Sequence, residues 1–481
     1  MSIDLSLDRL RRLVQHLPPY TRPTFHIAGT NGKGSVSAIL TSILCSSTPS
    51  LSVGRYNSPH LVSIHDCISV DDITIDAATY ADARSRIEHA DQVHDTKLSN
   101  FEILTLTALS IFEEAKVDVV VLEVGMGGRL DATNIIPDES VLVSVLTSVD
   151  LDHQFFLGDT VAEIAREKAG IARKGRAFVL GPQKHSEVLE SVQDVVSNVG
   201  GELVTSIKVS RRDWDRNVDG PLQSSFSMAT DDFSEPPPSP VTAHMPCFAC
   251  DIQATLPLFG DHQLENLGVA LTAISTLLVH PSSLHTKIAK SISPETVSKG
   301  IRSVRWPGRL SFHLLPAVPT RGITRPLIAL ADGAHNPASS ATLGSYITHL
   351  LSLVDKKTPL NLTYLLSLSH SPPKTPLQTL SPILPPTPPL QSSLNINLRV
   401  ACLRFTPPDE MPWVKSVAPE DIRGVVASLV PEAEVWVADG AIENQLQHAL
   451  EWAAGKEGDG LVVIAGSLYL IADLYRFLSI R

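Results

Sequence analysis

The sequence of 481 residues predicts an α/β fold, with a mostly parallel sheet in a first domain and a second, smaller α/β domain. Apolar runs of strand length alternate with segments of helical periodicity from residue 24 to about 208, and the alternation resumes at residue 310. The runs are nearly continuous in Val and Leu, as in parallel strands that are buried on both faces. We therefore expect one domain over residues 1–309 and another over 310–481.

The first 17 residues predict an amphipathic helix rather than a signal or transit peptide, because Asp4 and Asp8 interrupt its apolar positions. No apolar stretch reaches the ~18 residues of a membrane helix. Five scattered cysteines fit a reducing compartment, and Cys247 and Cys250 are expected to be free thiols, since no further zinc ligands stand nearby. We expect a cytoplasmic protein without a membrane partner.

The first strand and helix are joined by a glycine-rich turn in HIAGTNGKGSV, residues 26–36. A buried strand is expected over 24–28, and apolar residues recur at helical spacing from Val36 onward. The backbone N–H groups of such a turn and the helix N-terminus converge on an anion. The parts of a phosphate site are Gly29, Gly32, Gly34, Lys33 and the hydroxyl of Ser35 or Thr30. The common phosphate-loop pattern is imperfect here, because Ile27 replaces its first glycine, so a tight turn with an exposed lysine is the alternative.

The remaining elements follow in chain order. Further strands of the first region are expected in 117–125 and 140–146, and the later strands are expected in PLIALADG, NLTYLLSL, LRVACLRF, AEVWVADG and GLVVIAGSL. Helices are expected over 338–354 and 441–454 and at the C-terminus. Three segments break the alternation: a polar surface insertion at about 211–246, a connector at 298–309 and a Pro-rich extended surface loop at 371–390.

Polar clusters follow several predicted strands, where ligands gather at the carboxyl ends of a parallel sheet. The net charge of −12 and the lack of a long basic run argue against nucleic acid, but a small anionic substrate needs only local cations. A carboxylate beside a phosphate loop is a natural Mg²⁺ ligand, although each such side chain could also cap the following helix. The clusters are Ser58 with His60, Glu123, Asp150 with Asp152 and His153, Lys168, and Asp332 with His335 and Asn336.

Seven ordered motifs make the chain similar to the folylpolyglutamate synthase/dihydrofolate synthase family of the Mur ligase superfamily. They are HIAGTNGKGSV, SPHL, LEVGMGGRLDATN, DHQFFLGDTVAEIAREKAGI, GDHQLENLGVA, RWPGR and DGAHNP. The resemblance spans nearly the whole chain apart from 211–246 and 371–390. It implies a Mur-ligase-like ATPase domain with a P-loop, followed by a Rossmann-like glutamate-ligase domain.

The resemblance also implies roles for individual residues. Backbone amides of residues 29–35, including Asn31, and the Lys33 ammonium would hold ATP phosphates. Lys168 matches a lysine that is carbamylated in relatives, where it helps a second Mg²⁺, and Phe101 lies where relatives hold the pterin ring. The expected Mg²⁺ ligands are Ser58, Glu123 and His153. The expected nucleotide contacts are Asn266, Arg309, Asp332 and His335.

The resemblance implies ATP-dependent joining of L-glutamate to a carboxylate of dihydropteroate or folate through an acyl phosphate, with ATP and Mg²⁺ (two ions) required and a monomer expected. The stretch VSIHDCISV lacks the arginine common in polyglutamate synthases, and Asp66 would repel a polyglutamate tail if it faced one. We therefore expect a dihydrofolate synthase. The alternatives are a folylpolyglutamate synthase, a bifunctional enzyme, another Mur-type ligase or a non-catalytic nucleotide-binding protein.

Overall fold

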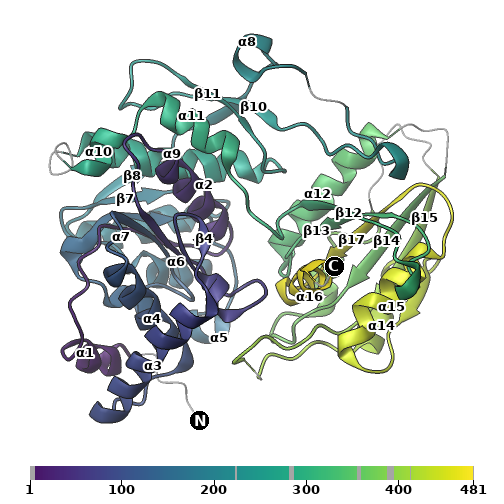
Figure 1. Cartoon of the computed structure of the whole chain (residues 1–481), viewed down its shortest axis with the longest axis horizontal. Helices are drawn as coiled ribbons and strands as arrows, with labels where there is room; N and C mark the ends of the chain where they lie inside the picture. The colour runs from purple at the N-terminus through teal and green to yellow at the C-terminus, as the bar shows by residue number, and fades with distance from the viewer. Residues whose placement is uncertain are drawn as a thin grey trace.

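The computed structural model describes residues 6–222, 225–280, 286–354, 359–386, 395–411 and 413–479. Two α/β domains lie side by side, with the N-terminal strands in one and the C-terminal strands in the other (Figure 1). No helix in these ranges is long and apolar enough to cross a membrane. The fold class expected from the sequence is confirmed, and the boundary at residue 309 stays a prediction.

The first domain is built on a sheet that, over the described residues, has eight strands in the order β4-β3-β2-β5-β1-β6-β7-β8. The strands are β1 (Thr24–Ala28), β2 (Val53–Tyr56), β3 (Ile68–Val70), β4 (Ile73–Thr74), β5 (Val119–Glu123), β6 (Val141–Leu146), β7 (Ala177–Leu180) and β8 (Glu202–Thr205). Central β1 pairs in parallel with β5 and β6, and β2 pairs in parallel with β5. The carboxyl ends of these four strands therefore meet at one rim.

Helices cover both faces of this sheet. They include α1 (Asp8–Val14), α2 (Lys33–Cys45), α3 (Ala77–His94), α4 (Asn100–Glu114), α5 (Gln154–Leu157), α6 (Val161–Ala169), α7 (Ser186–Val199), α9 (His262–Val279), α10 (Lys287–Ser291) and α11 (Pro294–Ser303). Phe25 and Ile27 enter the core beneath α2 and α9, whereas Val120 and Leu122 enter the core beneath α4. Because successive strand residues face opposite sides, two covered faces require the nearly continuous apolar runs of the sequence.

A small antiparallel sheet corrects the prediction of a surface insertion. Its strands are β9 (Val209–Arg211), β10 (Ser239–Ala243) and β11 (Ile252–Leu256), and the short helix α8 (Arg216–Asp219) lies between the first two. The strand β10 falls inside the segment 211–246, and its Val241 and Ala243 enter the first core. The expected connector at 298–309 is also wrong in its first half, which belongs to α11.

The second domain is built on a sheet that, in the described part of the chain, has six strands in the order β12-β13-β17-β14-β15-β16. They are β12 (Ser311–Leu315), β13 (Leu327–Ala331), β14 (Leu360–Leu366), β15 (Ile396–Cys402), β16 (Glu434–Val437) and β17 (Gly460–Ala465). All neighbours pair in parallel except β12, an antiparallel edge strand that the sequence did not predict. The covering helices are α12 (Pro337–Leu353), α13 (Pro376–Leu380), α14 (Pro419–Leu429), α15 (Ile442–Ala454) and α16 (Leu468–Ser479).

The Pro-rich segment is not the extended surface loop that the sequence predicted. It forms α13, and the side chains of Leu380, Ile383 and Leu384 are buried with those of α12 and β14. The Tyr364 hydroxyl of β14 donates a hydrogen bond to the Ile383 carbonyl at 3.3 Å. The prediction is therefore wrong for residues 376–384, and its last part, 387–390, lies outside the described residues.

The two domains contact each other through polar side chains at several places, and Phe259 of the first domain also packs in the core of the second, against Phe312 and Tyr346. The Arg84 guanidinium of α3 donates to both carboxylate oxygens of Glu410, at 2.6 and 2.5 Å. Asn336 donates from its side-chain amide to the Asn31 side chain at 3.2 Å. Arg476 of α16 donates to the Val62 carbonyl at 2.9 Å. These contacts hold the carboxyl-end rims of the two sheets toward each other.

The packing of the Pro-rich segment predicts a stability difference between two leucines. Leu384→Ala removes a fully buried side chain and is expected to lower the free energy of unfolding by about 2–5 kcal/mol. Leu377→Ala, in the same segment, removes a side chain that is 48% exposed and should change it by less than about 0.5 kcal/mol. Urea unfolding of both variants measures the difference, and equal midpoints would contradict the packing described here.

Candidate active site

The glycine-rich turn between β1 and α2 is held by close packing on three sides. A Cβ atom on Gly29 would lie 1.8 Å from Thr147 Oγ1, and one on Gly32 would lie 2.4 Å from Asn266 Oδ1. A Cβ on Gly34 would lie 2.5 Å from Trp306 Cζ2. Gly29 and Gly32 also have φ angles of 148° and 94°, which disfavour other residues. The packing and the backbone angles of the turn therefore require these glycines, whether or not a ligand is bound.

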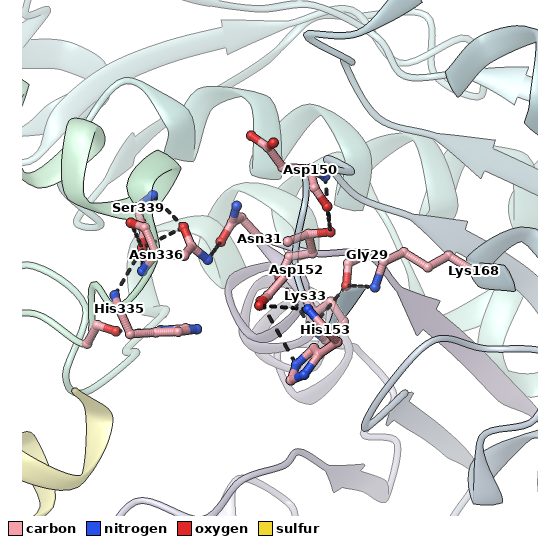
Figure 2. Close-up of polar contacts among 12 residues, drawn as sticks. Gly29, Asn31, Lys33, Asp150, Asp152, His153, Lys168, His335, Asn336 and Ser339 are labelled. Carbon is pink, nitrogen blue, oxygen red and sulfur yellow. Dashed lines mark hydrogen bonds and ion pairs between the residues drawn. The ribbon is translucent and has the colours of Figure 1, made fainter. Parts of the chain in front are cut away.

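Two lysine ammonium groups donate to the same carbonyl oxygen of the turn. Lys33 Nζ lies 3.1 Å from the Gly29 oxygen, and Lys168 Nζ of α6 lies 3.0 Å from it (Figure 2). Lys33 also lies 3.9 Å from a carboxylate oxygen of Glu123 at the end of β5. The alternative of a tight turn with an exposed lysine is thereby contradicted, since the Lys33 side chain is only 17% exposed.

Lys168 is a buried amine with an unusual protonation equilibrium. Burial, with a smaller contribution from the charge of Lys33, lowers its pKa to about 7. At neutral pH a substantial fraction of this amine is therefore uncharged and nucleophilic. The uncharged amine is the form that reacts with carbon dioxide to give a carbamate.

The end of β5 presents a buried carboxylate to the same rim. Burial raises the pKa of Glu123, while the neighbouring charge of Lys33 and a hydrogen bond from Asn57 lower it. The Asn57 amide donates to one carboxylate oxygen at 2.5 Å. Ser58 follows Asn57 directly after β2, which pairs with β5, so its position is adjacent to this carboxylate in the sheet.

The residues expected to bind a metal fit a hard cation in part. Glu123 is a buried anion whose charge a divalent cation would compensate. His153 begins α5 with a left-handed φ of 51°, and its ring lies 3.9 Å from an Asp152 oxygen. Burial and the charges of Lys168 and Lys33 lower the pKa of His153, against the opposing effect of Asp152, which favours the neutral ring that metals bind. Among the described residues, no group of three or more His, Cys, Asp or Glu side chains is arranged to hold a metal.

The helix α9 supplies the residue expected to contact a nucleotide from the first domain. Asn266 is buried against Gly32, and its amide donates to Gln263 at 2.9 Å. Gln263 in turn donates to the Ser35 hydroxyl at 3.2 Å. Asn266 and Ser35 therefore belong to one hydrogen-bonded group behind the turn.

Two expected nucleotide contacts, Asp332 and His335, follow β13 of the second domain, and a third, Arg309, lies just before β12 at the domain junction. Asp332 is buried and accepts backbone hydrogen bonds from Leu310 and Ala334 at 2.9 and 2.8 Å. A Cβ on Gly333 would lie 2.6 Å from Arg309 Nη1, so the guanidinium packs against this loop. Burial, followed by the charge of Lys374, lowers the pKa of His335 to about 4. His335 is therefore neutral at physiological pH.

The Asn31–Asn336 hydrogen bond brings these two groups together. Figure 2 shows Asn336, His335 and Ser339 at the start of α12 facing the turn that carries Asn31 and Lys33. Asn336 caps α12 by accepting from the Ser339 backbone at 2.9 Å. Residues that are far apart in sequence and are expected to contact a nucleotide therefore lie near one another. Their roles stay predictions.

Two residues singled out in the sequence have mainly structural contacts. Phe101 lies at the start of α4 with its ring against Gly125, where a Cβ would be 2.2 Å from Cζ. It is partly buried beside the glycine-rich loop after β5, which leaves part of its ring accessible. Asp66 accepts backbone hydrogen bonds from Val62 and Ser63 at 2.9 and 2.8 Å. The Asp66 carboxylate therefore caps its own turn. No contact of Asp66 supports its expected repulsion of a substrate tail.

Sequence analysis missed the residues that hold the expected ones in place. Thr147 donates to the Asn31 carbonyl at 2.7 Å and fits against Gly29, and Asn57 donates to Glu123. Thr147 and Asn57 each come directly after a strand whose carboxyl end lies at this rim. That position in the sequence is the signal that could have identified them. Their partners come from other strands, which a linear pattern does not reveal.

The contact between Gly34 and Trp306 predicts opposite outcomes for two glycine substitutions in helices. Gly34→Ala forces the indole to move and is expected to destabilise the protein by about 1–3 kcal/mol, despite the better helix propensity of Ala. Gly424→Ala in α14 meets no atom within 4 Å and should stabilise it by up to about 1 kcal/mol. Thermal unfolding separates the two, and stabilisation by both substitutions would exclude the proposed close packing.

Solved structures with the same architecture support the arrangement of the two domains. The chain matches a Mycobacterium tuberculosis folylpolyglutamate synthase complexed with ADP and AMPPCP, with a TM-score of 0.74 and 25% identity over 99% of this chain and 96% of that chain. It also matches E. coli FolC in complex with DHPP and ADP, with a TM-score of 0.72 and 25% identity over 100% and 95% of the two chains.

Sequence comparisons extend over the whole chain. Residues 320–477 match the family model described as dihydrofolate synthetase, C-terminal domain. The chain is 31% identical to the dihydrofolate synthetase of Saccharomyces cerevisiae, over 99% of this chain and 98% of the yeast protein. It is 30% identical to the probable dihydrofolate synthetase of Schizosaccharomyces pombe over the full length of both. The chain therefore belongs to the folylpolyglutamate synthase/dihydrofolate synthase family of ATP-dependent ligases.

Proposed function

We propose that this protein is a dihydrofolate synthase, which ligates L-glutamate to 7,8-dihydropteroate with conversion of ATP to ADP and phosphate. The observation that carries the proposal is the pair of ammonium groups on the Gly29 carbonyl, opposite the Asp332–His335 loop of the second domain. A glycine-rich turn with cations on one side and a second domain on the other suits phosphoryl transfer followed by attack of an amine.

The chemistry starts from a carboxylate, which is a poor electrophile. One oxygen of the pteroate carboxylate attacks the γ-phosphorus of ATP, and the bond to ADP breaks, giving an acyl phosphate. The Lys33 ammonium and the backbone N–H groups of the turn are placed to neutralise the charge on the transferred group. The glutamate amine then attacks the acyl carbon and phosphate leaves. Contact between the domain rims excludes water, which would hydrolyse the acyl phosphate.

A divalent metal is proposed as part of this site. Glu123, Ser58 and His153 are the residues that would hold Mg²⁺, and carbamylated Lys168 would assist a second ion. Bound Mg²⁺ supplies charge neutralisation at the phosphate oxygens. Of the three proposed Mg²⁺ ligands, Glu123 has the strongest support. Its carboxylate is buried, burial raises its pKa, and a bound cation would compensate its charge. We also propose that the protein is a monomer and that it acts in the cytoplasm.

Dihydropteroate is favoured over folate as acceptor by the full-length relatives. Both fungal relatives carry the name dihydrofolate synthetase and match along the entire chain. The relative from Mycobacterium tuberculosis named dihydrofolate synthase/folylpolyglutamate synthase matches 72% of this chain at 32% identity. The two activities share the ATP site, so the acceptor preference is the point that an experiment must decide.

A competition assay tests the acceptor. Purified protein receives ATP, Mg²⁺, L-glutamate, dihydropteroate and tetrahydrofolate, and mass spectrometry identifies the products over time. We expect dihydrofolate to dominate, with kcat/KM for dihydropteroate at least about 10-fold higher, since this is about 1.4 kcal/mol of discrimination. Products with several glutamates would move the assignment to a folylpolyglutamate synthase. No product from either acceptor would reject ligase activity.

The lowered pKa of Lys168 predicts a pH-dependent effect on stability. Between about pH 7 and the ordinary lysine pKa of about 10.5, the unfolded chain binds a proton that the folded chain does not, so folding becomes more favourable as pH rises. Lys168→Met removes this dependence. Its stability gain over the wild type should therefore be largest near pH 7 and shrink toward pH 10, by up to about 1.4 kcal/mol per pH unit.

Urea unfolding in buffers free of carbon dioxide, from pH 6.5 to 9.5, measures the effect of Lys168. Lys299→Met replaces an exposed lysine on α11 and serves as the control, with a difference from the wild type that is constant across the same range. A constant difference for Lys168→Met as well would show that this amine titrates normally.

A further inference from the structure

A loop of the first domain reaches into the core of the second. It comprises residues 225–235, between α8 and β10, where the chain crosses to the second domain (Figure 1), and we call it the strap. The backbones of Ser227 and Ser234 exchange hydrogen bonds at 3.1 and 3.3 Å, which close the strap on itself. Met228 within it is 5% exposed and lies in the same buried core as Leu343 of α12. The strap therefore completes part of the apolar core of the second domain.

Phe312 of β12 is the centre of the contact between the strap and the second domain. Its ring centroid lies 6.0 Å from that of Phe226 and 6.1 Å from that of Phe233. Phe259, which precedes α9 in the first domain, adds a third ring at 5.6 Å. Aromatic rings at these distances attract one another in addition to the gain from burial. Three rings from the first domain thus pack against one side chain of the second, which is 7% exposed.

The chain on either side of the strap is fixed to the first domain. Before it, the Arg212 guanidinium donates to both carboxylate oxygens of Asp219, at 2.7 and 2.6 Å, and to the Val241 carbonyl at 3.2 Å. After it, β10 forms antiparallel pairs with β9 and β11. A loop that is fixed at both ends cannot follow the second domain, so separation of the domains here requires the aromatic contact to break.

The aromatic contact lies beside residues that are expected to bind the nucleotide. Leu310, two residues before Phe312, belongs to the same buried core, and its backbone N–H donates to the Asp332 carboxylate at 2.9 Å. The Gly333 N–H donates to the Gly308 carbonyl at 3.0 Å. Leu310 also has a left-handed φ of 47°, a strained conformation for a residue other than glycine, which surrounding contacts must hold. Packing against Phe312 and Leu310 therefore fixes the corner at which the chain enters the second domain.

The strap differs in kind from the contacts between the rims. Those contacts are hydrogen bonds, such as the ones that join Arg84 to Glu410 and Asn336 to Asn31. When the rims separate, water replaces these hydrogen bonds, so their net contribution is small. Detachment of the strap instead exposes the buried face of Phe312 and its partner rings to water, which is unfavourable. The rims are therefore the side that separates more easily.

We propose that the strap fastens the second domain to the first where the chain passes between them, and that it keeps the corner with Arg309 and Asp332 in place when the rims separate. Movement of the domains is thereby limited to rotation about this corner. This role depends on packing alone, whatever reaction the site catalyses.

Limited trypsin digestion of the full chain tests the role of the strap. Cleavage after Arg309 requires Leu310, which is 2% exposed, to leave its core. Phe226→Ala/Phe233→Ala removes both strap rings and should speed this cleavage by at least about 10-fold, because local opening limits the reaction. Mass spectrometry measures the rate at which the peptide that begins at Leu310 appears.

Two controls separate the strap from general destabilisation. Trp436→Ala removes a partly buried ring that lies 6.2 Å from the ring of Trp452, with both partners in the second domain. Arg84→Gln breaks the contact with Glu410 between the rims. Both variants should leave cleavage after Arg309 within about twofold of the wild-type rate.

The digestion has outcomes that overturn the proposal. Equal rates for the wild type and the double variant do so, as does equal acceleration by Trp436→Ala, which marks unfolding of the second domain as a whole. Equal acceleration by Arg84→Gln shows that the rims hold the corner and overturns it too. Circular dichroism shows whether each variant is folded. If Phe226→Ala/Phe233→Ala unfolds, Phe226→Leu/Phe233→Leu replaces it, because leucine keeps much of the buried volume without the ring contacts.

Discussion

The carbonyl oxygen of Gly29 is the point on which the candidate site depends, because it accepts hydrogen bonds from both Lys33 and Lys168. Burial, with a smaller contribution from the charge of Lys33, lowers the pKa of Lys168 to about 7. The arrangement holds only because Thr147 and Asn266 fix the turn. Positive charge is thereby concentrated where phosphate groups are expected, and the burial of Lys168 prepares an amine for modification.

The second domain completes the site through a small number of directional contacts. Asn336 links the start of α12 to Asn31, and the bidentate Arg84–Glu410 pair joins the domains on another side. An apolar contact adds to these, because Phe259 of the first domain packs against Phe312 and Tyr346 of the second. The Asn31–Asn336 contact holds the His335 loop facing the turn that carries Lys33 (Figure 2).

Local patterns predicted many of the helices and strands, but they missed β12 and misjudged two segments. The turn at 26–36 was predicted because glycine, lysine and flanking apolar periodicity are all local signals, and β1 and α2 have those bounds within a few residues. The segment 371–390 was misjudged because its prolines obscure any periodicity. Leu380, Ile383 and Leu384 are buried by α12 and β14, which are distant in sequence. Asp66 was expected to repel a substrate tail if it faced one. Its carboxylate instead accepts hydrogen bonds from the backbone of its own turn.

The sequence by itself determined the α/β class, the two regions, the glycine-rich turn and the family, because each depends on residue type and order along the chain. It also indicated Glu123 and His153, since polar residues at or after strand ends meet at one rim, and the family motif indicated Lys168. Only the tertiary structure decided that Lys168 reaches Gly29 and that Asn57 donates to Glu123. The physical reason is that burial and charge proximity arise between residues that only the folded chain brings together.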